Sequence, residues 1–513
     1  MRLKDLISSS EIKGIKGDIE VDIKDIVYDS RKVKGGSLFV AIRGHITDGH
    51  GYIEDALRRG AIAIVAEEFD LSVLKQIQDY SRKPTAFITV SDSRRVLALL
   101  SDRFYAHPSG TLKLIGITGT NGKTTTSYLI KSILDVSGKR VGLLGTINYI
   151  IKEDRILPAL YTTPEALELQ GYLSDMLSGG MEYAVLEVSS HSLSFQRVVG
   201  CEFEVVLFTN LSQEHLDFHK TMEEYFGSKR RIFDLLRPGG VAVINIDDQA
   251  GKSLAGNLKG NILSFGLSGD ADLRAVGINS TLKGLTFEIE RPKGKIKIES
   301  PLVGMHNVYN ILASAGASLS LGIPPSNIKE GIARMKSIPG RFEKIEEGQD
   351  FTVVVDYAHT EDALKQVLTT ARELLEREQG SRRERKGGKI ITVFGCGGDR
   401  DRGKRPKMGE AASTLSDIVV ITSDNPRSED LSVIISEIEG GIRATGMSNY
   451  SVVPERREAI ERAIGLAEKG DFVLIAGKGH EDCQIIGNKR NPFDDRKVAR
   501  ETILKRVVQG ARG

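Results

Sequence analysis

Short runs of apolar residues recur along the whole chain, and between them apolar positions repeat with the spacing of a helix. Short continuous apolar runs are typical of buried strands, and helices between them are typical of parallel sheets covered on both faces. The pattern therefore predicts an α/β protein. With 513 residues, the chain is too long for a single hydrophobic core. We expect three domains, at residues 1–108, 109–337 and 338–513.

The first block, 1–108, predicts a small α/β domain. Its helical stretch GYIEDALRRG ends at Gly60, a residue suited to the end of a helix. The sequence His107-Pro108-Ser109-Gly110 is typical of a turn and marks the boundary to the next block. The strands expected here cover residues 26–30, 37–42, 61–67 and 85–90.

The second block, 109–337, predicts a mostly parallel sheet, because apolar runs and helical stretches alternate again. Between residues 272 and 299 apolar and polar residues alternate, which predicts antiparallel strands added to that sheet. A helix is expected around residues 307–321. The parallel strands expected here cover residues 112–118, 140–145, 183–188, 205–209 and 241–246.

The third block, 338–513, repeats the same rhythm and predicts a Rossmann-like α/β domain. It begins at the turn sequence Ile338-Pro339-Gly340. The charged run at 377–388 is interpreted as a solvated loop and not as a binding patch. The strands expected here cover residues 351–357, 389–395, 417–422 and 471–477.

Charge and cysteine content limit the partners and the compartment. The 71 basic and 69 acidic residues leave a net charge of +2, which gives no reason to propose nucleic acid or a membrane surface as a partner. The three cysteines are far apart, without metal-binding spacing, and suit a reducing compartment. The N-terminal sequence lacks the apolar stretch of a signal peptide. We expect a cytoplasmic protein that acts as a monomer on small molecules.

A glycine-rich loop follows the first strand of the second block and precedes a helical stretch. Such a loop lets backbone amides approach a phosphate, its lysine reaches the terminal phosphates, and its hydroxyl suits Mg²⁺. The strict P-loop spacing places a glycine where this chain has Ile117. The alternative, a turn that only caps a helix, is disfavoured by the lysine and the run of threonines. The expected ATP-binding residues are Gly119, Thr120, Asn121, Gly122, Lys123, Thr124 and Thr125.

Three further residues of the second block have two interpretations each. Glu187 ends a predicted strand, where a carboxylate could hold a metal or simply be solvated. His215 lies after the next strand, and a single histidine there is more often structural than a ligand. Lys229 lies in a helix whose basic run would ordinarily face solvent.

Taken in order, a series of motifs resembles the Mur ligase family over nearly the whole chain. The motifs are GTNGKTTT, TTPEAL (162–167), EVSSHSL (187–193), TNLSQEHLDFH (209–219), Lys229, HNVYN (306–310), GRFE (340–343) and DYAHTEDAL (356–364). The family's own loop is of the GTNGKT type, which accounts for Ile117.

The resemblance implies a role for each matching residue of the second block. Lys123 would bind the ATP phosphates, and Thr124, Glu187 and His215 would bind Mg²⁺. Lys229 would be carbamylated, so that an anion made from CO₂ could hold a second Mg²⁺. Asn307 would contact the nucleotide base, and Arg341 and Asp356 from the third block would close over ATP, with His359 close behind.

The third block bears on which amino acid is added. Arg400 and Arg427 follow predicted strands and suit a substrate carboxylate, and Glu481 suits an ammonium group. The sequence Asp424-Asn425-Pro426-Arg427 resembles the signature of family members that add meso-2,6-diaminopimelate, and lysine-adding members lack the arginine. The expected diaminopimelate contacts are Arg400, Asp424, Asn425, Pro426, Arg427, Gly477 and Glu481.

The first block would bind the uridine nucleotide of the second substrate, UDP-N-acetylmuramoyl-L-alanyl-D-glutamate. The sequence YDSRKV (28–33) resembles the family's uracil-side motif. In SHSLSFQRV, Phe195 stands where related sequences often carry a glutamine, and Gln196 follows it, so a glutamine contact is in doubt. The expected contacts with this substrate are Tyr28, Ser30, Ile46, Thr47, Asp48, Thr162, Thr163, Ser189 and Arg197.

The implied reaction is ATP-driven amide formation through an acyl phosphate. A lysine-adding relative, or another ligase of the superfamily such as folylpolyglutamate synthase, is the enzyme alternative. A P-loop ATPase that drives motion would hydrolyse ATP without an amino acid. A non-catalytic nucleotide-binding scaffold is disfavoured by the metal-type residues at several strand ends.

Overall fold

The computed structural model describes residues 1–7, 11–44, 47–69, 85–378 and 388–510. By internal contacts the chain divides into two compact units. The first comprises Met1–Thr118, Lys139–Leu207 and Gly227–Ala242, and the second Gly119–Gly138, Phe208–Phe226 and Val243–Gly513. Ile46, expected near the uridine, and residues 379–387 of the charged run lie outside the described residues.

The first unit begins with a sheet in the order β1-β5-β4-β3-β2, parallel except for the antiparallel pair β1–β5. Both faces are covered, because Leu38 and Val40 of β3 pack in one core and Phe39 in the other. The predicted strands are thus confirmed. The elements are α1 (Leu3–Leu6), β1 (Ile12–Lys16), β2 (Asp25–Val27), η1 (Ser30–Lys32), β3 (Ser37–Val40), η2 (Gly49–Tyr52), α2 (Ile53–Arg58), β4 (Ala63–Ala66), β5 (Ala86–Val90), α4 (Ser93–Phe104) and α5 (Pro108–Thr111).

A second sheet of the first unit runs in the order β12-β11-β6-β10-β7-β8-β9. Strand β10 pairs in parallel with β6 and β7, as predicted. The antiparallel strands β8 and β9 were not predicted. The elements are β6 (Lys113–Thr118), β7 (Val141–Leu144), β8 (Asn148–Lys152), β9 (Arg155–Pro158), α7 (Ala166–Ser178), β10 (Tyr183–Glu187), α8 (Ser190–Ser194), β11 (Phe203–Phe208), η3 (Arg231–Leu235) and β12 (Leu236–Asn245).

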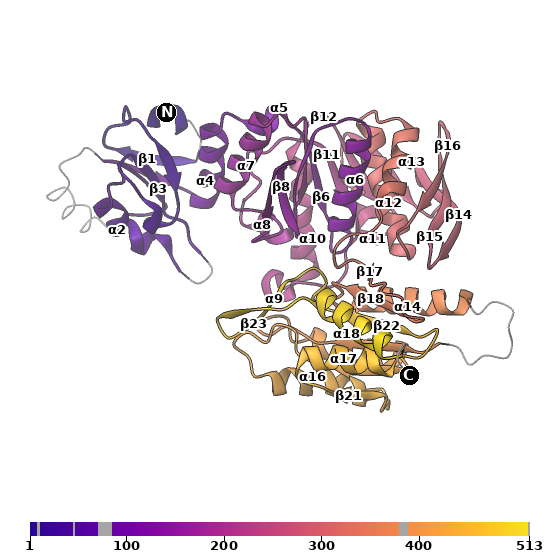
Figure 1. The fold of residues 1–513 in the computed structure, drawn as a ribbon. Helices are drawn as coiled ribbons and strands as arrows, with labels where there is room; N and C mark the ends of the chain where they lie inside the picture. Colours follow the sequence, from indigo (N-terminus) through magenta and orange to yellow (C-terminus); the bar gives the residue numbers. More distant parts are fainter. Residues whose placement is uncertain (8–10, 45–46, 70–84, 379–387, 511–513) are drawn as a thin grey trace. The chain divides into compact units, whose positions relative to one another are not determined.

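Strand β12 continues into the second unit, where β13, β14, β15 and β16 follow it in order. Figure 1 shows β14, β15 and β16 side by side, and their antiparallel pairing confirms the prediction for 272–299. Helix α6 packs against α12 and α13. The elements are α6 (Lys123–Val136), α9 (Leu216–His219), α10 (Met222–Arg230), α11 (Gln249–Asn257), β13 (Asn261–Gly266), β14 (Leu273–Thr281), β15 (Gly284–Arg291), β16 (Gly294–Ser300), α12 (Met305–Ser320) and α13 (Pro325–Arg334).

The rest of the second unit is built on a sheet in the order β17-β18-β22-β19-β20-β21, with only the β17 pairing antiparallel. Val354 packs in the core on one face, and Val353 and Val355 in the core on the other. The start of the charged run is helical and not a loop, because α14 extends to Glu378.

The elements of this part are β17 (Glu343–Lys344), β18 (Thr352–Asp356), α14 (Glu361–Glu378), β19 (Ile390–Phe394), α15 (Lys404–Leu415), β20 (Ile418–Ile421), α16 (Leu431–Ala444), β21 (Tyr450–Val452), α17 (Arg456–Leu466), β22 (Phe472–Ala476), β23 (Cys483–Ile486), β24 (Lys489–Pro492) and α18 (Asp495–Gly510). The α/β class with mainly parallel sheets is confirmed. Within the described part of the chain, no helix has the length and apolar character needed to cross a membrane.

Candidate active site

The loop that precedes α6 turns at two glycines with positive φ, 144° at Gly119 and 87° at Gly122. A Cβ at Gly119 would lie 1.9 Å from Thr209 Oγ1, and one at Gly122 would lie 2.3 Å from Asn310 Oδ1. Both positions therefore require glycine. Among the described residues, no side chain caps the N-terminus of α6. Its first amides and the positive end of its dipole thus suit an anion.

Asn210 and Lys123 fix the shape of this loop. Asn210 accepts hydrogen bonds from the amides of Thr120, at 2.9 Å, and of Asn121, at 2.8 Å. The Lys123 Nζ donates to the carbonyls of Gly119, at 2.9 Å, and Thr120, at 2.8 Å. The lysine charge is therefore held directly over the loop, as phosphate binding requires.

Glu214 is a residue that the sequence interpretation missed. Its mostly buried carboxylate lies 3.3 Å from His359 Nε2 and 3.6 Å from His215 Nε2. Burial alone would raise the pKa of Glu214, but the hydrogen bond with His359 and the charges of His215 and Lys123 hold that pKa far below its ordinary value. The site thus contains a fixed negative charge next to the P-loop lysine.

Arg341, predicted to close over ATP, contacts the P-loop helix. Its Nη2 donates to Thr124 Oγ1 at 3.2 Å, and its guanidinium lies 4.4 Å from the centre of the Tyr357 ring. Asp356, from the end of β18, is buried, and its two oxygens accept from the amides of Phe342 and Ala358, both at 2.7 Å. Asp356 therefore holds the turn that carries Arg341.

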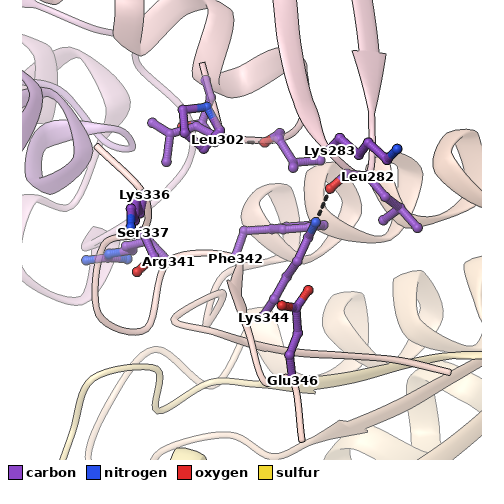
Figure 2. A pocket seen from close by; sticks show the side chains of 12 residues that line it. Leu282, Lys283, Leu302, Lys336, Ser337, Arg341, Phe342, Lys344 and Glu346 are labelled. Carbon is purple, nitrogen blue, oxygen red and sulfur yellow. Dashed lines mark hydrogen bonds between the residues drawn. The ribbon is translucent and has the colours of Figure 1, made fainter. Parts of the chain in front are cut away.

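A cavity of about 430 Å³ lies beside Arg341 (Figure 2). Asn307, the residue expected to contact the base, lines it, together with apolar and cationic residues. The Asn307 Nδ2 donates to Val303 O at 2.7 Å, and its Oδ1 accepts from Asn310 Nδ2 at 3.0 Å. The lining residues are Leu282, Lys283, Pro301, Leu302, Val303, Asn307, Lys336, Ser337, Arg341, Phe342, Lys344 and Glu346.

The loops after β19 and β20 bring Arg400 and Arg427 to the same place. A Cβ at Gly397 would lie 3.0 Å from Arg427 Nη1 and 3.8 Å from Arg400 Cγ. Burial and the charge of Arg400 lower the pKa of Arg427. Arg427 adopts a left-handed backbone, with φ of 51°, and such strain is found preferentially at functional sites. Two arginines that border the same glycine suit a carboxylate ligand.

A second cluster joins Asn425, after β20, to Glu481, after β22. The Asn425 Nδ2 donates to Glu481 Oε2 at 2.9 Å. Lys478, another residue that the sequence interpretation missed, donates to the same Glu481 oxygen at 2.8 Å and to Asn425 Oδ1 at 3.0 Å. A Cβ at Gly477 would lie 2.7 Å from Asp424 Oδ2, so a side chain there would displace the carboxylate. Pro426 lies against the loop after β19, because a Cβ at Gly398 would lie 1.9 Å from Pro426 O.

In the first unit, Glu187 and the threonines expected to hold the dipeptide form one hydrogen-bonded group. Glu187 is fully buried, and its carboxylate accepts from the amide and the hydroxyl of Thr146, at 3.2 and 2.8 Å. The Thr162 hydroxyl lies 3.2 Å from that of Thr146. Thr163 donates to Glu187 O at 2.8 Å and accepts from the Ser189 amide at 3.1 Å.

Arg197 belongs to a neighbouring cluster that contains Phe195. The Arg197 guanidinium pairs with Glu165 at 2.6 Å and donates to Thr163 O at 3.0 Å. Phe195 contacts two cations, with the guanidinium carbons of Arg94 and Arg197 at 4.6 and 5.6 Å from its ring centre. Phe195 thus helps to order Arg197. The glutamine that related sequences often carry at this position could instead bind substrate directly.

The residues expected near the uridine are spread over the N-terminal sheet. The Tyr28 hydroxyl donates to Glu168 Oε1 at 2.9 Å, and Ser30 is buried at the start of η1. Asp48 accepts from the amide of His50 at 3.0 Å, and the Thr47 carbonyl accepts from Gly44.

The four proposed metal ligands belong to different units, with Thr124 and His215 in the second and Glu187 and Lys229 in the first. Lys229 is 1% exposed, which corrects the expectation that its basic run faces solvent, although Arg230 is exposed. Within the described residues, no group of three or more His, Cys, Asp or Glu side chains could hold a metal. The proposed set contains only two such side chains, so it does not conflict with that finding.

Family models match most of the chain. The Mur ligase family catalytic domain matches residues 22–105, the Mur ligase middle domain residues 117–318, and the Mur ligase glutamate ligase domain residues 340–479. The three matches are consecutive along the chain.

Individual relatives match over nearly the full length. The chain is 43% identical to the UDP-N-acetylmuramoyl-L-alanyl-D-glutamate–2,6-diaminopimelate ligase of Geobacter metallireducens, with 97% of each chain covered. A solved structure of a ligase with that name is 33% identical, with a TM-score of 0.67 and 99% of each chain covered. The MurF ligase of Thermotoga maritima, solved with ADP, is 22% identical and shares the fold, with a TM-score of 0.59 and 94% of this chain and 96% of that chain covered. The chain belongs to the Mur ligase family.

Proposed function

We propose that this protein is an ATP-dependent ligase that joins meso-2,6-diaminopimelate to UDP-N-acetylmuramoyl-L-alanyl-D-glutamate. The observation that carries the proposal is the pair Arg400 and Arg427, which both border Gly397 at the carboxyl ends of parallel strands. The names of relatives that are more than 40% identical support the same reaction.

The second unit would bind ATP. The phosphates suit the loop 119–125, where Lys123 offsets their charge, and the base suits the cavity that includes Asn307. Arg341 connects the two, because it lines that cavity and also donates to Thr124. Asp356 would act through Arg341. We assign ATP binding to Gly119, Thr120, Asn121, Gly122, Lys123, Thr124, Thr125, Asn307, Arg341 and Asp356.

Mg²⁺ fits most of the proposed donor set, because a hydroxyl, a carboxylate and a carbamate supply oxygen ligands, and only His215 supplies nitrogen. Thr124, Glu187 and His215 would hold one Mg²⁺ ion, and carbamylated Lys229 would hold a second. When bound, Mg²⁺ would offset negative charge on the ATP phosphates. Lys229 is buried, and a lysine adds CO₂ only through its neutral amine.

The two other substrates would bind through separate groups of residues. The first unit would hold the UDP-dipeptide through Tyr28, Ser30, Ile46, Thr47, Asp48, Thr162, Thr163, Ser189 and Arg197. The loops after β19, β20 and β22 would hold diaminopimelate through Arg400, Asp424, Asn425, Pro426, Arg427, Gly477 and Glu481. We further propose that residues 1–108, 109–337 and 338–513 act as three domains for UDP, ATP and amino acid, in a cytoplasmic monomer.

With the three substrates bound in this way, the ligation would proceed in two steps. A substrate carboxylate attacks the γ-phosphate of ATP and gives an acyl phosphate and ADP. The diaminopimelate amine then attacks the acyl carbon, and phosphate leaves from a tetrahedral intermediate. Lys123 offsets charge on the transferring phosphoryl group, while Arg400, Arg427 and Glu481 hold the distal end of diaminopimelate.

A ligation assay with both amines tests this proposal against a lysine-adding ligase. ATP, the UDP-dipeptide and either diaminopimelate or lysine are supplied, and phosphate release and the tripeptide product are measured. We expect release to require both the amine and the UDP-dipeptide, and diaminopimelate to be preferred. Preference for lysine would overturn the specificity, and release without any amine would favour an ATPase.

Substitution of Arg427 tests the assignment of the amino-acid site. Arg427→Ala should raise the KM for diaminopimelate at least about 10-fold, because a bidentate contact is lost, and leave the KM for ATP unchanged. Arg443→Ala is the matched control, since Arg443 is exposed on α16 and pairs only with Glu439 at 3.2 Å among the described ion pairs. Equal kinetics of the two variants would remove Arg427 from the site.

A further inference from the structure

Lys478 has no assigned role, although it lies between residues proposed to bind the amino acid. It follows β22 and is fully buried, with 0% of its surface exposed. Its Nζ contacts Glu481 Oε2 at 2.8 Å and Asn425 Oδ1 at 3.0 Å. Lysine is almost never buried this completely without a charged partner, and Glu481 is that partner here.

The three side chains share their hydrogen bonds in a defined way. Glu481 uses Oε2 for both Lys478 and Asn425 Nδ2, so Oε1 is the oxygen that can accept from a substrate ammonium. The Asn425 Oδ1 accepts from Lys478 and from the Ile485 amide at 2.9 Å, which fixes the orientation of the amide group. Lys478 therefore holds both residues in one geometry.

Lys478 also changes the charge that a substrate meets. The cations Arg400 and Arg427 and the anions Asp424 and Glu481 surround the same region, and the charges of Arg400, Asp424 and Glu481 all act on Arg427. Arg456 is neutralised separately, because it pairs with Asp495 at 2.7 Å. The ammonium of Lys478 offsets the charge of Glu481, so among these residues Arg400 and Arg427 face only the anion Asp424 and keep one net positive charge for a carboxylate.

We propose that Lys478 is a specificity-determining residue, which makes the amino-acid site favour a distal group that carries both carboxylate and ammonium over one that carries ammonium alone. The inference rests on the proposed function. The carboxylate of a zwitterionic end is attracted by the two arginines, and this attraction offsets the repulsion between its ammonium and Lys478. The side chain of lysine carries only an ammonium group, which Lys478, Arg400 and Arg427 all repel. Its attraction to Glu481 is weakened, because Lys478 already partly neutralises that carboxylate. Lys478 thus disfavours lysine as a substrate relative to diaminopimelate.

Replacement of Lys478 by a neutral residue of similar length tests the inference. In Lys478→Met, Glu481 retains the hydrogen bond from Asn425, and Asn425 retains that from the Ile485 amide. We expect the ratio of kcat/KM for lysine to kcat/KM for diaminopimelate to rise about 10-fold, the effect of one unit charge at a partly screened site. Both values come from the same preparation, so a loss of folded protein cancels in the ratio.

Two further variants complete the test. Lys478→Gln removes the same charge with a polar side chain and should raise the ratio as well, which covers the case in which the Met variant does not fold. Lys389→Met is the matched control, because Lys389 is 49% exposed near the start of β19, and it should leave the ratio unchanged. An unchanged ratio in a charge-removing variant that still adds diaminopimelate would overturn the inference alone. Wild-type protein that adds neither amine would overturn the proposed function, and the inference with it.

Discussion

Glu214 Oε1 lies 3.3 Å from His359 Nε2, so an acid from the segment after β11 is paired with a histidine from the segment after β18. The other ring nitrogen of His359 lies 2.8 Å from the carbonyl of Tyr357. Both ring nitrogens of His359 therefore face oxygen atoms. Both residues of the pair belong to the second unit.

Glu214→Gln should lower kcat at least about 10-fold and destabilise the protein by about 3 kcal/mol, because cations remain without their buried anion. Steady-state kinetics and urea unfolding measure the two effects. Glu361→Gln is the control, since Glu361 forms only a surface pair with Lys365 among the described ion pairs, and should change stability by less than about 0.5 kcal/mol. Full activity of Glu214→Gln would show that the pair has no part in the reaction.

The environment of Glu429 leads us to expect that the stability of the folded protein depends on pH. It accepts from buried Arg405 at 2.8 Å and from the amide of Asp399 at 2.5 Å, beside the loop of Arg400. The hydrogen bond from Arg405 is the largest of the effects that lower the pKa of Glu429 to about 2 from an ordinary 4.5. Because the folded-state pKa is the lower one, the stabilisation is complete above pH 4.5 and is lost as the pH falls toward 2.

Glu429→Gln should therefore unfold more easily than the wild type at neutral pH, by about 2 kcal/mol. The difference should shrink when unfolding is measured at successively lower pH between 5 and 3. A difference that stays constant over this range would contradict a contribution from the charge of Glu429.

The sequence predicted the strands well and the charged networks poorly, for physical reasons. Buried parallel strands such as β10 appear as continuous apolar runs, whereas the edge strand β9 alternates between half-buried and exposed residues and has no such run. Glu214 was missed although it lies inside the motif TNLSQEHLDFH, and Lys478 was missed although it follows Gly477 directly. Their partners His359 and Asn425 are distant in sequence, and only the folded sheet brings them together.

Phe195 should position Arg197 for the UDP-dipeptide. Removal of its ring deprives Arg94 and Arg197 of cation–π contacts worth about 0.5–2 kcal/mol each. Phe195→Leu should raise the KM for the UDP-dipeptide about 3- to 10-fold and leave the KM for ATP unchanged. Phe195→Tyr, which keeps an aromatic face, should keep the wild-type value. If Phe195→Tyr is as impaired as Phe195→Leu, the ring contacts are not the cause.

Substitution of Lys229 tests whether this lysine carries a carbamate. Lys229 is 1% exposed, and its neighbour Ser228 anchors the end of α10 by donating to Ser190 O at 2.8 Å. Lys229→Ala should lower kcat at least about 100-fold, because an anion proposed to bind metal is lost. Short-chain carboxylates in the assay should restore part of the rate by occupying the space left by the side chain, and Lys229→Glu should retain more activity than Lys229→Ala.

The same carboxylates should not activate the wild type, and Arg230→Ala, at an exposed neighbour on α10, is the matched control. Wild-type rates in Lys229→Ala, or a defect that no carboxylate relieves, would contradict a carbamate at this position.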